Sequence, residues 1–239
     1  MEIILLKLLS KGDEIKVVYV LEHPDSFGAE LIEKSRLFMS EQRLKKIFFY
    51  RMEQDRINSC AVYLLLRYAL AREYGIRLAP DFVFGDHEKP YLKELPEIHF
   101  NLSHCKTAVC CIVSDSNTAI DINDIRSVGD AVIRRVCSEN EQQAIMKSPK
   151  PDICFMEYWT KKECYSKLTG AGMSMDFSKI TAELPDYKSI RTKVYDDYVL
   201  SYYSRREEEI HKPSLNQIFE LLDKISGLDK EIGDSGCIF

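Results

Sequence analysis

The chain has 239 residues, of which 45% are hydrophobic and 30% charged, a composition typical of a folded globular protein. Its formal net charge of −5 argues against a general nucleic-acid-binding protein, because phosphate backbones are bound by concentrated lysine and arginine. Any anionic ligand must therefore be held by a local basic pocket.

The amino-terminal apolar run at residues 3–6 is too short for a signal peptide or a membrane span, so it predicts a strand and no membrane association. The eight cysteines form no Cys-x-x-Cys pair, and Cys110-Cys111 lie within an apolar run. We therefore expect free thiols in a cytoplasmic protein, since disulfides are rare in that reducing compartment.

The first half of the chain combines strand-like and helical patterns. Residues 17–21 are apolar enough for a strand, and the amphipathic pattern over 29–47 predicts a helix. Residues 53–74 lack glycine and proline and carry apolar residues at helical spacing, which predicts the main core helix of this half. A loop-rich connection then leads to residues 99–102.

The middle of the chain begins with two strand patterns. Residues 107–113 are apolar and β-rich, and residues 117–125 follow after a short polar turn, so the pair is predicted to form a hairpin. Helical patterns follow over 128–147, interrupted near Cys137-Ser138, and over 153–168, where Gly170 is suited to end the helix.

The last part of the chain returns to strand patterns, at residues 180–184, 192–195 and 198–202, before a helical pattern that begins after Ser214. Together these elements predict an α+β fold with lobes at residues 1–113 and 114–203. Residues 204–239 form a charged tail whose helix is expected either to pack on the body or to await a partner.

The segment Ala119-Ile-Asp-Ile-Asn123 contains a candidate metal site. Alternate side chains of a strand share a face, so Asp121 and Asn123 point one way while Asp124 points the other. Two oxygens at one spot suit magnesium, which binds hard oxygen ligands. The alternative for this segment alone is a polar strand end.

A second candidate stripe lies on the predicted helix at 153–168. Trp159, Glu163 and Lys167 are spaced by four and therefore share one helix face. The alternative is a solvated ion pair between Glu163 and Lys167, which contributes little to stability.

Ser103-His104 form a third candidate. A serine hydrolase is disfavoured, because adjacent residues do not normally place the histidine nitrogen on the neighbouring hydroxyl and no Gly-x-Ser-x-Gly elbow is present. Donation of hydrogen bonds to phosphate oxygens fits the pair better, and a turn that uses both side chains for its own backbone is the alternative.

Read together, these motifs follow a definite order: His99-Phe-Asn-Leu-Ser-His104, Ala119-Ile-Asp-Ile-Asn123, then Trp159-x-x-Lys-Glu163-x-x-x-Lys167 and Gly170-Ala-Gly172-Met-Ser174. The series resembles the Sfp-type 4′-phosphopantetheinyl transferases. The resemblance covers about residues 40 to 180. It implies an α+β fold of two similar lobes with the active site between them.

The implied reaction is transfer of the 4′-phosphopantetheine arm of coenzyme A to a serine of an acyl or peptidyl carrier protein, with Mg²⁺ as cofactor and adenosine 3′,5′-bisphosphate as product. The resemblance places Asp121, Asn123 and Glu163 at magnesium ligands. Glu163 is the candidate base, and Lys167 would offset charge on the leaving phosphate. Glu141 matches a further acidic position.

The resemblance also implies residues that bind coenzyme A. They are Ser103, His104 and Arg56 on the 3′-phosphate side, Lys89 and Pro90 near the adenine, and Lys167 at the pyrophosphate. A basic helix face offers contacts to an acidic carrier helix or is simply solvated, and it comprises Arg43, Lys45, Lys46 and Arg51.

Asn123 is the main departure from the family, which usually has an acid there. An amide oxygen can bind magnesium but brings no charge, so weaker metal binding is expected. Ala171, between the two glycines, leaves out a lysine that many relatives carry.

Three alternatives remain open. The first is a degenerate homologue that binds coenzyme A or carrier protein without catalysis, which Asn123 favours. A magnesium-dependent phosphohydrolase is the second and a structural interaction module the third. We expect no nucleic-acid partner, and a monomer would suffice if both lobes lie in one chain.

Overall fold

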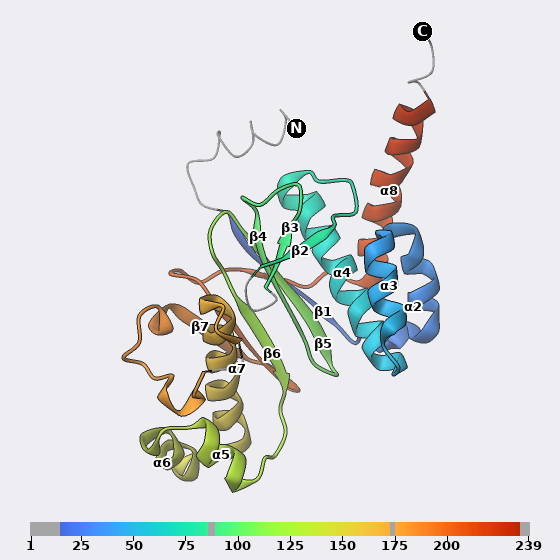
Figure 1. The fold of residues 1–239 in the computed structure, drawn as a ribbon. Coiled ribbons are helices and arrows are strands. Elements are labelled where there is room, and N and C mark those ends of the chain that lie inside the picture. The colour runs from blue at the N-terminus through green and yellow to red at the C-terminus, as the bar shows by residue number, and fades with distance from the viewer. Residues whose placement is uncertain (1–14, 86–88, 173–174, 235–239) are drawn as a thin grey trace.

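The computed structural model describes residues 15–85, 89–172 and 175–234, so the strand predicted at residues 3–6 lies outside the described residues. The fold of these described residues is α+β, as predicted, with three sheets and with helices gathered into two groups (Figure 1). No helix in the described part of the chain is long and apolar enough to cross a membrane.

The first sheet has the strand order β4-β5-β1-β9, in which only the β1–β9 pair is parallel. Its strands are β1 (Lys16–Glu22), β4 (His99–His104), β5 (Ala108–Ser114) and β9 (Ile210–His211). The long helix α4 (Glu53–Tyr74) packs across β1, β4 and β5, and its residues supply much of the first hydrophobic core. Residues 53–74 are therefore the core helix that the sequence predicted.

The helix predicted over residues 29–47 is two helices, α2 (Gly28–Ser35) and α3 (Glu41–Phe49). A short 3-10 turn, η2 (Arg36–Phe38), and extended backbone at Met39 separate them. Ser40 begins α3 because its hydroxyl accepts a hydrogen bond from the backbone N–H of Arg43 at 3.3 Å.

The carboxyl-terminal helix α8 (Leu215–Asp234) packs on the body rather than standing free. It joins α2, α3 and α4 on one side of the first sheet (Figure 1), and Leu215, Ile218 and Leu222 are buried in the first core. The segment before it returns to the first sheet as β9.

The second sheet has the order β6-β8-β7 and is antiparallel throughout. Its strands are β6 (Ile120–Asp124), β7 (Ile190–Val194) and β8 (Tyr198–Tyr203). Helix α7 (Pro151–Thr169) packs across all three strands, and α5 (Asp130–Val136) and α6 (Glu139–Lys147) lie beside it. Gly170 ends α7 in the left-handed conformation, as predicted, with φ 73°.

The remaining elements are short. They are the β2–β3 pair and three 3-10 turns: β2 (Phe82–Phe84), β3 (Pro90–Leu92), η1 (Pro24–Phe27), η5 (Phe177–Lys179) and η6 (Tyr187–Ser189).

The two larger sheets meet where β6 lies beside β4. A third apolar cluster, with Val20, Ile112, Ile120 and Leu200 among its members, joins them. Side chains of β4 bridge to the backbone of β6: Asn101 Oδ1 accepts from Ile120 N at 3.0 Å, and Ser103 Oγ accepts from Ile122 N at 3.4 Å. We call this contact the sheet junction.

Two predictions about strands are wrong. The strands at 107–113 and 117–125 exist but do not form a hairpin, because β4 and β1 already occupy both edges of β5, and β6 pairs with β8 instead. Residues 180–184 are not a strand: Ile180 is buried, and the chain then turns through a hydrogen bond from Leu184 N to Thr181 O.

Candidate active site

A buried carboxylate lies at the sheet junction. Asp121, on β6, is 4% exposed, and its Oδ1 accepts hydrogen bonds from Lys167 Nζ at 2.6 Å and from Ser103 Oγ at 2.9 Å. Lys167 Nζ also donates to Ser103 Oγ and to the carbonyl of Ile120. Side chains from β4 and α7 therefore both contact the Asp121 carboxylate of β6.

Asn123 lies on the same face of β6 as Asp121, as strand alternation predicts. Its Nδ2 donates to Asp121 Oδ2 at 2.8 Å. Asp124 points elsewhere and accepts from the backbone N–H groups of Lys106 and Thr107. Both oxygens of Asp121 are thus already bonded within the protein.

Glu163 is a second carboxylate near Asp121. Burial raises the pKa of the Glu163 carboxyl, the negative charge of Asp121 raises it further, and the positive charge of Lys167 opposes both. Among the described residues Glu163 has no hydrogen-bond or ion-pair partner, so the solvated Glu163–Lys167 pair is not formed.

Lys167 stays cationic in this setting. Burial alone would lower its pKa, but the adjacent Asp121 carboxylate outweighs burial and the pKa is raised. The cluster therefore holds one carboxylate in an ion pair, Asp121, and one that has no ion pair among the described residues, Glu163. Within the described ranges, no three His, Cys, Asp or Glu side chains gather as a metal centre.

Ser103 and His104 are neighbours on β4 and serve different sides of it. Ser103 faces the sheet junction, whereas His104 and Leu102 line a pocket of about 240 Å³ on the opposite side. The pKa of His104 is lowered, first because neighbouring protein displaces water from the ring and then because Lys167 is positive. We call this cavity the α3–α4 pocket.

The α3–α4 pocket combines basic and apolar lining. Arg43, Lys46, Phe84 and Pro90 contribute to its wall, besides His104, and Asp55 adds one carboxylate beside these three basic side chains. The Lys46 ammonium lies over the Phe84 ring, 5.4 Å from its centroid. A basic and aromatic pocket of this kind suits a planar group that carries negative charge.

Arg43 is the most unusual of these groups. It is 7% exposed, its Nη2 donates to Ser59 O at 2.7 Å and Ser59 Oγ at 2.9 Å, and its buried Nε has no hydrogen-bond partner in the described chain. Burial lowers its pKa. Arg43 is therefore not part of an exposed basic helix face, which corrects the grouping with Lys45, Lys46 and Arg51.

The three other predicted coenzyme-binding residues lie around this region in different ways. Pro90 lines the α3–α4 pocket, and Arg56 Nε donates to the carbonyl of Tyr50, which also lines it. Lys89 Nζ instead donates to Asn117 Oδ1 at 2.8 Å, and burial lowers its pKa. The Asn117 side chain in turn donates to the carbonyl of Leu168 near the end of α7.

Glu141 does not join the site. It forms a buried ion pair with Lys162 at 2.6 Å and closes a capping box with Ser138 at the start of α6. The match of Glu141 to a further acidic site position is therefore not reflected in a contact with Asp121 or Glu163.

An apolar groove of about 690 Å³ lies beside α7. Trp159, one turn before Glu163 on α7, lines it together with Val132, Val136, Met175 and Phe177. Trp159 stacks on Phe155 and on Phe177, with centroid distances of 6.2 and 5.6 Å.

Sequence reasoning missed Arg43 and Phe84 as pocket residues. The signal for Arg43 was Ser40, an N-cap residue three positions earlier, which fixes the start of α3 and hence the inward face of Arg43. Phe84 lies on β2, and no motif marked it.

Comparisons with known proteins agree on one family. Residues 118–217 match the family described as the 4'-phosphopantetheinyl transferase superfamily. This region includes β6 and α7, and therefore Asp121, Glu163 and Lys167.

Three relatives illustrate the similarity. The 4'-phosphopantetheinyl transferase psf-1 of Bacillus pumilus is 28% identical over 68% of this chain and 71% of its own length. The 4'-phosphopantetheinyl transferase Sfp of Bacillus subtilis (strain 168) is 24% identical over 73% and 80%. The L-aminoadipate-semialdehyde dehydrogenase-phosphopantetheinyl transferase of Candida glabrata is 26% identical over 74% and 78%.

Proposed function

We propose that this chain, a member of the Sfp-type 4′-phosphopantetheinyl transferase family, transfers the 4′-phosphopantetheine arm of coenzyme A to a serine of an acyl or peptidyl carrier protein. The serine oxygen bonds to the phosphorus that carries pantetheine. The bond from that phosphorus to the bridging pyrophosphate oxygen breaks, and adenosine 3′,5′-bisphosphate leaves.

One observation carries the proposal: the buried Asp121 carboxylate is bonded to Lys167, and a second carboxylate, Glu163, lies one turn from Lys167 on the same face of α7 without an ion-pair partner of its own among the described residues. Uncompensated charge in a partly buried cluster disfavours the folded state and is typical of sites that bind a charged ligand. Both carboxylates and the lysine lie within the region that matches the family.

Glu163 is the proposed base. Its carboxylate lies on the same face of α7 as Lys167, one turn away, and a carboxylate of this kind can accept a proton in a transfer reaction. It takes the proton from the carrier serine as the new phosphorus–oxygen bond forms. Lys167 remains positive and stabilises the negative charge that develops on the leaving phosphate.

Magnesium fits the donor set at the sheet junction. Asp121 and Glu163 supply two carboxylates and Asn123 an amide oxygen, all hard ligands, and their negative charge exceeds what Lys167 alone offsets. When bound there, Mg²⁺ would neutralise charge on the pyrophosphate. Because Asn123 now donates to Asp121, its role as a ligand is the weakest of the three.

The α3–α4 pocket is the proposed site for the nucleotide end of coenzyme A. The unpartnered buried Nε of Arg43 supports an anionic ligand there, and His104 and Lys46 add donors for a phosphate. Pro90 and Phe84 offer apolar contacts for the base. Arg56 and Lys89 are proposed to contact coenzyme A at the edge of this pocket. Ser103 is proposed to act from the sheet junction, where it bonds Asp121 and Lys167.

We also propose that residues 1–113 and 114–203 act as two similar lobes, with the site between them, and that the tail at 204–239 serves the first lobe. Each lobe has a long helix on an antiparallel sheet, which supports the division. With both lobes in one chain, a monomer in the cytoplasm is the proposed form. Its seven described cysteines are free thiols.

The second candidate is a homologue that binds coenzyme A and carrier protein without transfer. The observation in its favour is that Asn123, in place of an acid, ties up one oxygen of Asp121. It predicts binding without product.

Incubation with coenzyme A, Mg²⁺ and several apo carrier proteins, followed by intact mass measurement, tests the function. We expect one carrier serine to gain the phosphopantetheine mass, and a carrier in which that serine is alanine to gain none. No mass gain on fatty-acid, polyketide or peptide synthetase carriers would refute transfer. Phosphate release from coenzyme A without a carrier would instead indicate a phosphohydrolase.

A further inference from the structure

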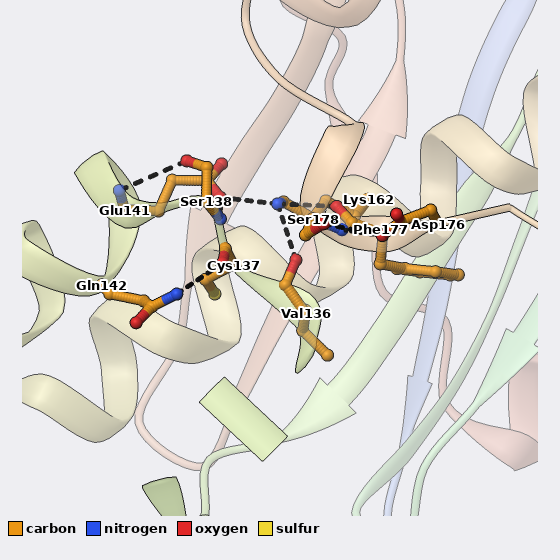
Figure 2. Close-up of polar contacts among 9 residues, drawn as sticks. All are labelled: Val136, Cys137, Ser138, Glu141, Gln142, Lys162, Asp176, Phe177 and Ser178. Carbon is orange, nitrogen blue, oxygen red and sulfur yellow. Dashed lines mark hydrogen bonds and ion pairs between the residues drawn. The ribbon is translucent and has the colours of Figure 1, made fainter. Parts of the chain in front are cut away.

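A buried lysine lies next to Glu163 along α7, outside the reacting cluster. Lys162 is 0% exposed, and its ammonium uses all three of its donors (Figure 2). The acceptors are Glu141 Oε2 at 2.6 Å, the carbonyl of Val136 at 2.9 Å and the carbonyl of Phe177 at 2.9 Å.

These three acceptors come from three separate segments. Val136 is the last residue of α5, Glu141 lies in the first turn of α6, and Phe177 begins η5. Glu141 is itself held, because its Oε2 accepts from Ser138 N at 2.7 Å (Figure 2). Lys162 therefore ties α7 to both small helices and to the segment that follows Gly170.

The contact fixes the rotation of α7 about its axis. Successive residues of a helix point about 100° apart, so Lys162 and Glu163 face different neighbours. Lys162 faces α5, α6 and η5. Glu163 lies one turn before Lys167 on the same helix face, and Lys167 contacts Asp121, so this face of α7 is turned toward Asp121. A small rotation of α7 would break the bonds of Lys162 and move Glu163 away from Asp121.

The same bonds hold two walls of the apolar groove. Val136 and Phe177 line it from opposite segments, and Trp159 of α7 lies against Phe177. Since Lys162 bonds the backbone of both residues, it sets the spacing between α5 and η5 beside the site.

We propose that Lys162 and Glu141 are positioning residues: their buried pair sets the orientation of Glu163 toward Asp121 and holds η5 against α5. The part of this proposal that concerns catalysis rests on the proposed function. The part that concerns the orientation of α7 is independent of what the protein catalyses.

Stability alone is a poor explanation for this pair. Taking two charges out of water is costly, and apolar residues of similar volume often replace a buried ion pair without loss of stability. The hydrogen bonds of Lys162 to three segments, in contrast, are directional and allow only one packing of α5, α6 and η5 against α7. Apolar contacts would define that packing less strictly.

The test compares Glu141→Gln and the paired variant Lys162→Met/Glu141→Met with a matched control, Arg67→Met. Arg67 is also a buried cation that donates to backbone carbonyls, those of Phe38 and Arg77, but it lies in the first core away from α7. The paired variant removes both charges, so it does not leave one of them buried alone.

The first readout is hydrogen–deuterium exchange without substrate. Each variant is measured at the same number of degrees below its own unfolding midpoint. We expect faster exchange than in the wild type in α7 and at residues 175–179 of the paired variant. We expect no such increase in these segments of Arg67→Met. Unchanged exchange in these segments would overturn the proposal, whatever the protein catalyses.

The second readout is steady-state transfer at varied Mg²⁺ and coenzyme A. We expect the paired variant to lose about 10- to 100-fold in kcat and to need more Mg²⁺ for half-maximal rate, the effect of losing a supporting contact, with the KM for coenzyme A unchanged. Glu141→Gln should fall between it and the wild type.

A paired variant that folds and keeps wild-type kcat would overturn the positioning role, as would an equal loss of kcat in Arg67→Met. If the wild-type protein modifies no carrier, the proposed function fails, and the exchange readout still decides whether the pair orients α7.

Discussion

Helix α7 carries two lysines that each pair with a carboxylate, and the two pairs differ in how completely they are closed. In the Lys162–Glu141 pair the side chains are 0% and 11% exposed, and every donor of Lys162 is used. In the Lys167–Asp121 pair they are 28% and 5% exposed, and Glu163 adds a negative charge without its own cation. A closed pair specifies structure, whereas an open, unbalanced one can receive a ligand.

The largest effect is expected for Asp121→Asn. This change removes the charge that holds Lys167 and one proposed metal ligand, so transfer should fall by about 10³-fold or more. Rates of carrier modification measure it, and coenzyme A binding by calorimetry serves as the control. A loss below about tenfold would show that the open pair is not the reaction centre.

The two lysines should separate activity from stability. Lys167→Met should lower transfer by about 10²- to 10³-fold. It should lower the free energy of unfolding by only about 1–3 kcal/mol, because Ser103 Oγ and Asn123 Nδ2 still donate to the Asp121 carboxylate. Lys162→Met leaves Glu141 buried without a cation and should cost about 3–5 kcal/mol with a smaller loss of activity. Denaturant unfolding and transfer rates check both variants. If one variant lost more of both activity and stability than the other, the distinction between the two lysine pairs would be contradicted.

Asn123→Asp should increase the excess of negative charge around the Lys167–Asp121 pair. Without metal, the new carboxylate repels Asp121 and the Nδ2 bond is lost, so the unfolding temperature should fall. Mg²⁺ should then restore more stability than in the wild type, with a half-saturating concentration about fivefold lower, which corresponds to roughly 1 kcal/mol of added attraction. An unchanged Mg²⁺-induced shift would place this side chain away from the metal.

The smallest effect concerns Glu163 and pH. Because its pKa is raised in the folded protein, ionised Glu163 destabilises the fold above that pKa, and the penalty disappears below the unfolded pKa. In metal-free buffer, Glu163→Gln should therefore be more stable than the wild type near neutral pH, and this gain in stability should shrink as pH falls. Thermal unfolding across pH measures it, and a gain that does not vary with pH would argue against the raised pKa.

The sequence was most informative where short-range geometry decides. Strand alternation predicted that Asp121 and Asn123 share a face, and helix ends were marked by Gly170 and by the break at Cys137-Ser138. The long helix at 53–74 followed from its uninterrupted pattern. These features depend on residues that are neighbours along the chain.

Long-range pairing was not predictable in the same way. The apparent hairpin failed because the edges of β5 were already taken by strands far away in sequence. The i,i+4 spacing of Glu163 and Lys167 permits an ion pair between them, but Lys167 forms its ion pair with Asp121 instead. Lys162 and Glu141 are 21 positions apart, and nothing in the sequence links them.

The reaction-centre claim is tested most directly by single-turnover transfer with the wild type and Glu163→Gln, using one apo carrier and saturating coenzyme A and Mg²⁺. The account predicts that the wild type adds one phosphopantetheine to the carrier serine, and that Glu163→Gln remains folded and binds coenzyme A but is about 10³-fold slower. A Glu163→Gln rate within about tenfold of the wild type would contradict it.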